Sequence, residues 1–397
     1  MTARPEDETD MGHLASVLTE VRGSLAESGT VVEPADVVAA LPRAGAALGH
    51  GAALVAGALA RAELLGAGPL QPLLDDPGVT DVLVNGGEGV WVDRGRGLER
   101  CLTVRLDDGG ARALAIRLAA ACGQRLDDAC PVADGRLPDG TRLHAVLPPL
   151  SADGTAISLR TLRRRALTMA ELVSGGVVGL EGAELLRALV TSRANVLVSG
   201  ATGVGKTTLL AAMLSLVPAD ERIVCIEEAP ELNPAHPHVV HLQVRRANVQ
   251  GAGEIGLDQL VRAAVRMRPD RLVLGECRGP EVRDVLGALN TGHDGGWATV
   301  HANAAGDVPA RLTALGALAR MDAASVAAQA VSALDAVLHL RRHAGVRRLS
   351  EVAVLEHDPA GRLVGVLAAS IGADGQLKPG PGWDRLARRL ERPDSAR

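Results

Sequence analysis

The second half of the chain alternates between two hydrophobic patterns. From Leu172 onward, short apolar runs of strand-forming residues are followed by longer stretches with helical periodicity. This alternation is typical of a parallel sheet with helices on both faces. The predicted strands are residues 195–199, 222–227, 271–275, 336–340 and 349–355, and the predicted helices are 206–216, 257–267 and 281–289, with Ala-rich helices after Asp307.

The first half of the chain has a different pattern. After a polar start, residues 14–25 and 37–65 have helix-forming composition with an Ala-rich apolar face. From Pro69 the chain changes to short runs of β-forming residues around one helical stretch. The predicted elements there are strands at 81–85, 89–93 and 156–160, a helix at 111–122, and a hairpin that turns at Pro138, Asp139 and Gly140.

These changes of pattern divide the chain into four parts. At about 150 residues per domain, the 397 residues have room for two or three domains with sizeable cores. The expected parts are a disordered and helical N-terminal extension (1–68), a smaller α+β domain (69–167), an α/β domain (168–360) and a C-terminal tail (361–397).

Composition and charge narrow the class of protein. The net charge of −5 does not favour a protein that grips nucleic acid by bulk charge. The acidic N-terminus does not resemble a signal peptide, and the apolar stretch 51–60 is far shorter than the roughly 20 residues that span a bilayer. The five cysteines lack zinc-ligand spacing. We therefore expect a cytoplasmic protein without a transmembrane segment.

Residues 200–207 read GATGVGKT and fit the phosphate-binding loop, because a predicted strand precedes them and a predicted helix follows. Glycines let the N–H groups point at phosphate oxygens, Lys206 would reach the β- and γ-phosphates, and the Thr207 hydroxyl would bind Mg²⁺. Only Lys206 and Lys378 are lysines among 42 basic residues, which suggests that a compact ammonium is needed at Lys206. The alternative is a Gly-rich turn that matches by chance. The candidate nucleotide-binding residues of this segment are Gly200, Ala201, Thr202, Gly203, Val204, Gly205, Lys206, Thr207 and Thr208.

Acidic residues close two other predicted strands. Glu276 follows strand 271–275, and Glu227 and Glu228 lie at the end of strand 222–227. Because the carboxyl ends of parallel strands meet at one edge, we expect all three beside the phosphate loop. There Glu276 would orient or deprotonate the attacking water, and Glu276 or Glu228 would bind Mg²⁺ directly or through water. Solvated glutamates are the alternative, and a small-molecule kinase would use similar parts, so these motifs predict a nucleotide but not the reaction.

A histidine-containing motif, TGHDGGWATVHAN, places His293 and His301 eight residues apart around a short strand. Neither a cysteine nor a third ligand is spaced to bind a metal with them. Together with GATGVGKT, IEEAPEL and RMRPDRLVLGECRG, this motif resembles the four boxes of the type II/type IV secretion ATPase superfamily. Within it the chain is most similar to the tight-adherence (Flp-type) pilus assembly and conjugal-transfer-associated ATPases. The resemblance extends upstream through PLLDDPGVTDVLVNG, DGRLPDGTRLHAVLPP and ISLRTL.

The resemblance implies a cytoplasmic homo-hexamer that binds ATP and Mg²⁺ and is peripherally associated with the inner face of the cell membrane. Each subunit would have an N-terminal domain and a RecA-like P-loop ATPase domain, and partners would be inner-membrane pilus or secretion platform proteins. The residues that would be catalytic are Glu276, Lys206, Glu227, Glu228, His301, His293 and Arg160. Arginines expected at the phosphates match Arg136, Arg142 and Arg160, and also Arg245.

The sequence departs from the family at a few points. Glu228 stands where the family usually has Asp, Ala247 stands within a motif that usually reads Arg-Pro-Pro-Asn, and Ala252 replaces a lysine. The tetracysteine insertion of classical type II secretion ATPases is absent. The function that the sequence favours is an ATP-hydrolysing motor for pilus assembly or secretion. The alternatives are a RecA-like ATPase for DNA translocation or conjugation, and a nucleotide-dependent regulatory switch.

Overall fold

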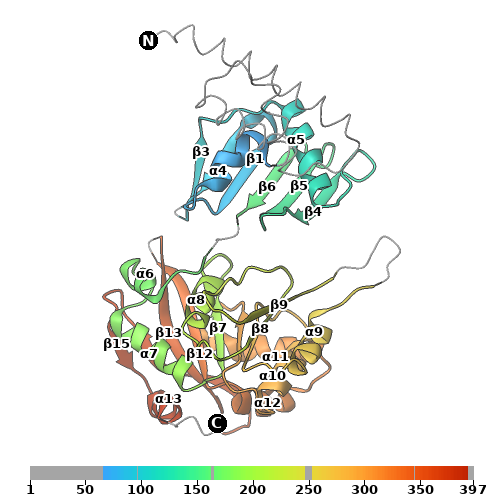
Figure 1. The fold of residues 1–397 in the computed structure, drawn as a ribbon. Coiled ribbons are helices and arrows are strands. Elements are labelled where there is room, and N and C mark those ends of the chain that lie inside the picture. Colours follow the sequence, from blue (N-terminus) through green and yellow to red (C-terminus); the bar gives the residue numbers. More distant parts are fainter. Residues whose placement is uncertain (1–65, 96, 162–164, 246–252, 344, 392–397) are drawn as a thin grey trace. The chain divides into compact units, whose positions relative to one another are not determined.

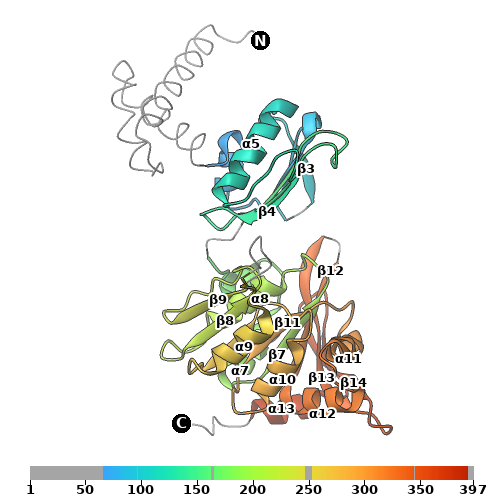
Figure 2. The same ribbon diagram turned by 90° about the vertical axis from the view of Figure 1, so that its right-hand side faces the viewer.

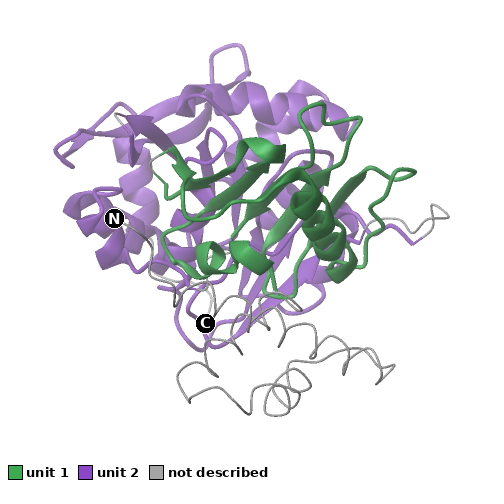
Figure 3. Ribbon diagram, turned by 90° about the horizontal axis from the view of Figure 1, so that it is seen from above, with its two compact units in different colours: residues 1–162 green, residues 163–397 purple. Residues whose placement is uncertain are grey.

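The chain splits into two compact units, residues 1–162 and 163–397, which are coloured separately in Figure 3. The helices predicted at 14–25 and 37–65 lie outside the part of the chain that the structure describes. The computed structural model describes residues 66–95, 97–161, 165–245, 253–343 and 345–391.

Unit 1 is an antiparallel sheet with helix α5 on one face (Figures 1 and 2). Its strand order is β3-β2-β1-β6-β5-β4. Successive residues of a strand point to opposite faces, so Val82 and Val84 are buried with Leu114 and Leu118 of the helix, whereas their neighbours face away from it. The Asp107 carboxylate accepts a hydrogen bond from the Gly110 N–H and begins the helix. The elements are η1 (Gly68–Leu70), α4 (Gln71–Asp75), β1 (Asp81–Asn85), η2 (Gly86–Glu88), β2 (Val90–Asp93), β3 (Leu98–Cys101), α5 (Asp108–Ala121), β4 (Val132–Arg136), β5 (Arg142–Val146) and β6 (Ala156–Arg160).

Unit 2 is built on a mixed sheet of nine strands in the order β15-β14-β13-β12-β7-β11-β10-β8-β9. The six strands from β12 to β9 run parallel, and β13, β14 and β15 extend the sheet antiparallel. Its strands are β7 (Val196–Gly200), β8 (Ile223–Glu227), β9 (Val239–Gln243), β10 (Arg271–Leu274), β11 (Trp297–Val300), β12 (Ala336–His343), β13 (Val346–His357), β14 (Leu363–Ile371) and β15 (Leu377–Pro379). Its helices are α6 (Met169–Ser174), α7 (Leu180–Thr191), α8 (Lys206–Leu214), α9 (Leu257–Val265), α10 (Val282–Leu289), η3 (Ala305–Asp307), α11 (Val308–Leu318), α12 (Ala323–Ala333) and α13 (Trp383–Leu390).

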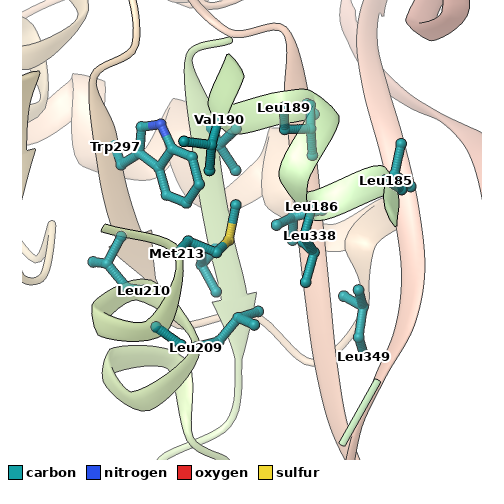
Figure 4. Close-up of a cluster of buried hydrophobic side chains, with 14 of the residues drawn as sticks. Leu185, Leu186, Leu189, Val190, Leu209, Leu210, Met213, Trp297, Leu338 and Leu349 are labelled. Carbon is teal, nitrogen blue, oxygen red and sulfur yellow. The ribbon is translucent and has the colours of Figure 1, made fainter. Parts of the chain in front are cut away.

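Helices cover both faces of this sheet, as the sequence pattern predicts. One buried cluster joins the sheet to α6, α7, α8 and α13, and a second joins it to α9, α10, α11 and α12. Figure 4 shows the first cluster, in which Leu186 and Leu189 of α7 and Met213 of α8 lie beside Trp297 and Leu338 of the sheet. The helix that follows the phosphate loop is therefore fixed to the sheet by apolar packing.

The C-terminal part of the chain differs from the expected tail. Strand β14 pairs with β13 and β15 pairs with β14, so these residues extend the same sheet. Helix α13 buries Leu386 in the first cluster of unit 2. The physical reason is that β14 alternates only weakly between buried and exposed positions, which hides it in the sequence, whereas pairing with β13 satisfies its backbone groups.

Candidate active site

The phosphate loop lies between the inner strand β7 and helix α8. Strand β7 is buried along its whole length between β12 and β11, so the loop leaves the middle of the sheet. Gly200 has φ 146°, and a Cβ there would lie 2.6 Å from the Leu340 carbonyl oxygen. Gly205 has φ 99° and precedes the first residue of α8. Larger side chains would strain both positions, which explains the glycines at these points of the motif.

Lys206 is buried at the start of α8 and makes three polar contacts. Its Nζ donates to the carbonyl oxygens of Gly200 at 3.0 Å and Ala201 at 3.1 Å, and lies 3.2 Å from Nδ1 of His301. Burial lowers the pKa of the Lys206 ammonium below its usual value. The ammonium is thus held inside the loop by acceptors that phosphate oxygens could replace.

His301 connects Lys206 to Glu276. Its Nε2 lies 2.7 Å from Oε1 of Glu276, while its Nδ1 faces the Lys206 ammonium. Burial, and then the neighbouring ammonium, lower the pKa of His301. A neutral imidazole that donates from Nε2 to the carboxylate and accepts at Nδ1 from the ammonium satisfies all three groups.

Glu276 is also held by an arginine that the sequence analysis did not single out. Arg278 donates from Nε to Oε1 at 2.5 Å and from Nη2 to Oε2 at 2.9 Å. Burial alone would raise the pKa of Glu276, but the hydrogen bond from Arg278 and the nearby cations bring it below its usual value. Arg278 lies two residues after Glu276 within the RMRPDRLVLGECRG motif, and this position was the signal that could have found it.

Glu227 and Glu228 lie at the end of a strand that is not a neighbour of β7. Strands β11 and β10 stand between β7 and β8, and three strand spacings of about 4.8 Å separate β7 from β8. Glu228 joins the site indirectly, because its Oε2 lies 3.2 Å from Nη1 of Arg278. Glu227 is buried, and its Oε1 accepts the N–H groups of Glu231 and Leu232 at 2.8 and 2.9 Å.

His293 and Arg245 are not brought to this cluster. His293 precedes β11, at the opposite end from His301, and its Nδ1 lies 3.2 Å from the Ala288 carbonyl oxygen of α10. Arg245 follows the edge strand β9, where its Nε donates to the Gly253 carbonyl. His293 and His301 are only eight residues apart in the sequence, but the extended strand β11 between them places them at opposite edges of the sheet.

Three arginines form a row across the sheet of unit 1. Arg136 pairs with Arg142, and Arg142 pairs with Arg160, on the neighbouring strands β4, β5 and β6. Directly paired residues point to the same face, and here it is the face opposite α5. Arg160 also donates from Nε to Oδ1 of Asp81 at 2.9 Å. We call Arg136, Arg142 and Arg160 the arginine row.

The residues of unit 2 fit a magnesium–nucleotide complex. Mg²⁺ prefers one or two protein oxygens together with phosphates and water, and Thr207 and Glu276 offer hard oxygen ligands at this edge. Among the described residues, Oε2 of Glu227 is buried without a hydrogen-bond partner, and it lies 3.8 Å from Nδ1 of His241. No group of three or more His, Cys, Asp or Glu within the described residues could hold a metal ion by itself.

Comparison with known proteins identifies the family of this chain. Residues 63–361 match the model of a family described as type II/IV secretion system protein. The chain belongs to this family. A putative conjugal transfer protein of Mycobacterium tuberculosis is 54% identical over 300 residues, which are 74% of this chain and 85% of the relative. The type IV secretion system protein VirB11 of Brucella suis is 31% identical over 259 residues, 59% of this chain and 72% of the relative.

Solved structures of secretion ATPases share the fold. The ATPase DotB of Yersinia pseudotuberculosis aligns with a TM-score of 0.51 at 17% identity, over 75% of this chain and 77% of that one. The pilus retraction motor PilT with bound ADP aligns with a TM-score of 0.50 at 20% identity, over 81% and 84%. The ATPase domain of this secretion-family member is therefore of the RecA-like P-loop type, as the sequence predicted. No helix within the described residues is long and apolar enough to cross a bilayer.

Proposed function

We propose that the chain is the ATP-hydrolysing motor subunit of a system that assembles a pilus or secretes protein across the cell envelope. The observation that carries this proposal is the unbroken contact from Lys206 through His301 to Glu276, which links the phosphate loop to a carboxylate on a nearby strand end. A carboxylate at that place suits a reaction in which water is the phosphoryl acceptor. The family match favours this reaction over transfer to a small molecule.

In the proposed reaction, ATP binds with its phosphates over the N-terminus of α8. Lys206 exchanges the Gly200 and Ala201 carbonyls for β- and γ-phosphate oxygens and offsets their charge. Glu276 accepts a hydrogen bond from the attacking water and orients it, and His301 holds the carboxylate in place. The water oxygen bonds to the γ-phosphorus as the bond to the β–γ bridging oxygen breaks. The proton that the water loses passes to Glu276 and from there to solvent, and ADP and inorganic phosphate leave.

Magnesium would be held by the Thr207 hydroxyl, by the nucleotide phosphates, and by Glu276 or Glu228 directly or through water. When bound, it would neutralise charge on the β- and γ-phosphates. Arg278 lies between the two glutamates, so it fixes how far their carboxylates stand apart before the ion binds.

We propose that the arginine row of unit 1 supplies further positive charge to the nucleotide. Like charges directly opposite one another in a sheet are destabilising, and two such pairs stand side by side in the row. Arg160 also pairs with Asp81, and the summed positive charge of the row would attract an anionic ligand. A motor would then couple hydrolysis to motion by gaining and losing these contacts.

We also propose a homo-hexamer that is cytoplasmic and works on inner-membrane pilus or secretion platform proteins. The support is the family match and the relatives that carry the name of type IV secretion system protein. The relative named as a conjugal transfer protein keeps DNA translocation as the rival function.

Phosphate release by the purified chain tests the proposal and its rivals. The rate with Mg-ATP is measured alone, with membranes of cells that express the associated pilus or secretion genes, and with single- or double-stranded DNA. A motor hydrolyses ATP and is stimulated by the membranes. Stimulation by DNA alone supports the conjugation ATPase, and tight ATP binding without turnover supports a regulatory switch; either result contradicts the proposal.

Replacing His301 with glutamine is expected to lower kcat by about 10-fold or more, because Glu276 and Lys206 both lose their common partner. His293→Gln is the matched control, since His293 contacts α10 at the other end of the strand. Its kcat should stay within about twofold of the parent value. Steady-state phosphate release measures kcat for both variants. An equal fall of kcat in the two would contradict the role of His301 between Lys206 and Glu276.

Replacing Arg160 with alanine is expected to lower kcat by at least about 10-fold while ADP affinity stays unchanged, because a charge that meets the γ-phosphate acts mainly in the transition state. Arg100→Ala in the same unit is the control, since Arg100 lies on the edge strand β3 and donates to the Glu88 carbonyl. Phosphate release and ADP titration report the two quantities. An unchanged kcat for Arg160→Ala would contradict the role of the arginine row.

A further inference from the structure

The hairpin between β12 and β13 extends past the phosphate loop. Strand β12 pairs in parallel with β7, and Leu340 stands opposite Gly200, the last residue of β7. The next residues, Arg341 to His343, therefore continue beyond the end of β7 at the level of the loop. This end of β12 lies on the side of β7 away from β11, whose end carries His301.

Two pairs of arginines face one another across this hairpin. Arg341 is opposite Arg348, and Arg342 is opposite Arg347. Such like-charged pairs are destabilising in an antiparallel ladder. Nη1 of Arg341 lies 3.5 Å from Oε1 of Glu351, and Nη1 of Arg348 donates to the Ala373 carbonyl oxygen at 2.5 Å. Within the described residues Arg342 has no ion-pair partner. We call Arg341, Arg342, Arg347 and Arg348 the arginine hairpin.

The two pairs point to opposite faces of the sheet. Arg342 shares a face with Leu340, and Arg347 with Leu349, because residues two apart in a strand lie on the same side. Leu340 and Leu349 belong to the core cluster that contains Leu209 of α8. Arg342 and Arg347 therefore lie on the face of the sheet that α8 covers, and Arg341 and Arg348 lie on the other face.

Arg347 runs beside the phosphate loop itself. Its Cδ lies 3.6 Å from the position that a Cβ on Gly205 would take. Gly205 immediately precedes α8, whose N-terminal N–H groups and Lys206 already make this end electropositive. Positive charge from Arg347 and Arg342 adds to that potential, so this end of the loop would attract a bound anion.

We propose that Arg347, supported by Arg342, binds the α- and β-phosphates of the nucleotide and so contributes equally to ADP and ATP binding. This inference rests on the proposed function, because it takes the same loop to be the nucleotide site. In the proposed site the γ-phosphate lies toward β11, where His301 joins Lys206 to Glu276. The arginine hairpin lies on the β12 side, so its arginines meet the part of the nucleotide that ADP and ATP share.

The test is the affinity of the full chain for ADP and for a non-hydrolysable ATP analogue, measured by equilibrium titration. Arg347→Ala is expected to weaken both by the same factor of about 10 or more, since it removes a charge-assisted hydrogen bond. In steady state KM for ATP should rise by a similar factor while kcat changes little, which is the behaviour of uniform binding. Arg342→Ala should have a smaller effect in the same direction.

Arg348→Ala is the matched control, because it removes an arginine of the same hairpin that lies on the other face. Its affinities should remain within about twofold of the parent chain. Arg347→Lys keeps the charge but loses the planar fork, so it should fall between the parent and Arg347→Ala. It also provides a measurement if the alanine variant does not fold.

The outcomes separate this inference from the proposed function. A parent chain that binds neither nucleotide contradicts both. If the parent chain binds both nucleotides and Arg347→Ala binds them with the same affinity, only the proposed role of the arginine hairpin is overturned. Loss confined to the ATP analogue overturns the assignment to the α- and β-phosphates. The inference is also overturned if Arg342→Ala/Arg347→Ala keeps its nucleotide affinity but no longer binds vesicles of phosphatidylglycerol and phosphatidylcholine that the parent binds.

Discussion

Replacement of Lys206 with alanine is expected to lower the rate of ATP hydrolysis by about 10³-fold, the largest effect of any single change in this chain. The ammonium is buried beside the Gly200 and Ala201 carbonyls and His301, which hold it inside the loop. Loss of this charge removes stabilisation from the phosphates as negative charge shifts toward the leaving group. Single-turnover phosphate release with saturating ATP measures the effect.

The second lysine of the chain provides the control. Lys378 lies on the edge strand β15, far along the sheet from β7, so Lys378→Ala should hydrolyse ATP at the parent rate. Thermal unfolding of both variants separates loss of activity from loss of fold. We expect Lys206→Ala to stay folded, because Leu209 and Leu210 of the same helix remain in the core. Turnover by Lys206→Ala close to the parent rate would contradict the phosphate-loop assignment.

Replacement of Glu276 with glutamine is expected to lower kcat by about 10²-fold or more while nucleotide affinity stays within a few-fold of the parent. The amide keeps the shape of the side chain but can neither accept a proton nor carry the charge that pairs with Arg278 and His301. Titration with a fluorescent ADP analogue reports affinity, and phosphate release reports kcat. This split between binding and turnover is what a water-orienting carboxylate requires.

Glu184→Gln is the control for this substitution. Glu184 lies on the exposed side of α7, so the same chemical change there should affect neither affinity nor kcat. If Glu276→Gln lost affinity and turnover by the same large factor, Glu276 would be needed to build the site and not to act on water. Its contacts with Arg278 and His301 would then be structural.

Much of the fold could be predicted because local pattern and tertiary structure agree. The buried runs of β7, β8 and β10 and the helices after them were visible as apolar periodicity, and β1 and β6 begin and end where the pattern indicated. Strands β3, β9 and β14 were hidden, because their side chains alternate weakly and their stability comes from pairing with neighbours.

The sequence by itself determined the phosphate loop and the carboxylate that follows β10. Their chemistry depends on residues that are close along the chain: the glycines and Lys206 act within one turn, and Glu276 is placed by the strand that it ends. These two motifs predicted a nucleotide site, and the family resemblance added the prediction of a secretion ATPase.

Only the tertiary structure decided which distant residues join that loop. Strand order, which local sequence does not encode, inserts β11 and β10 between β7 and β8. His301, which follows β11, therefore reaches Lys206, whereas Glu227 ends a strand that is not a neighbour of β7. Register, which depends on pairing between strands, aligns the arginine row and sets Arg347 beside Gly205. Both are properties of contacts between segments far apart in the chain, and for that physical reason they appear only when the sheet is assembled.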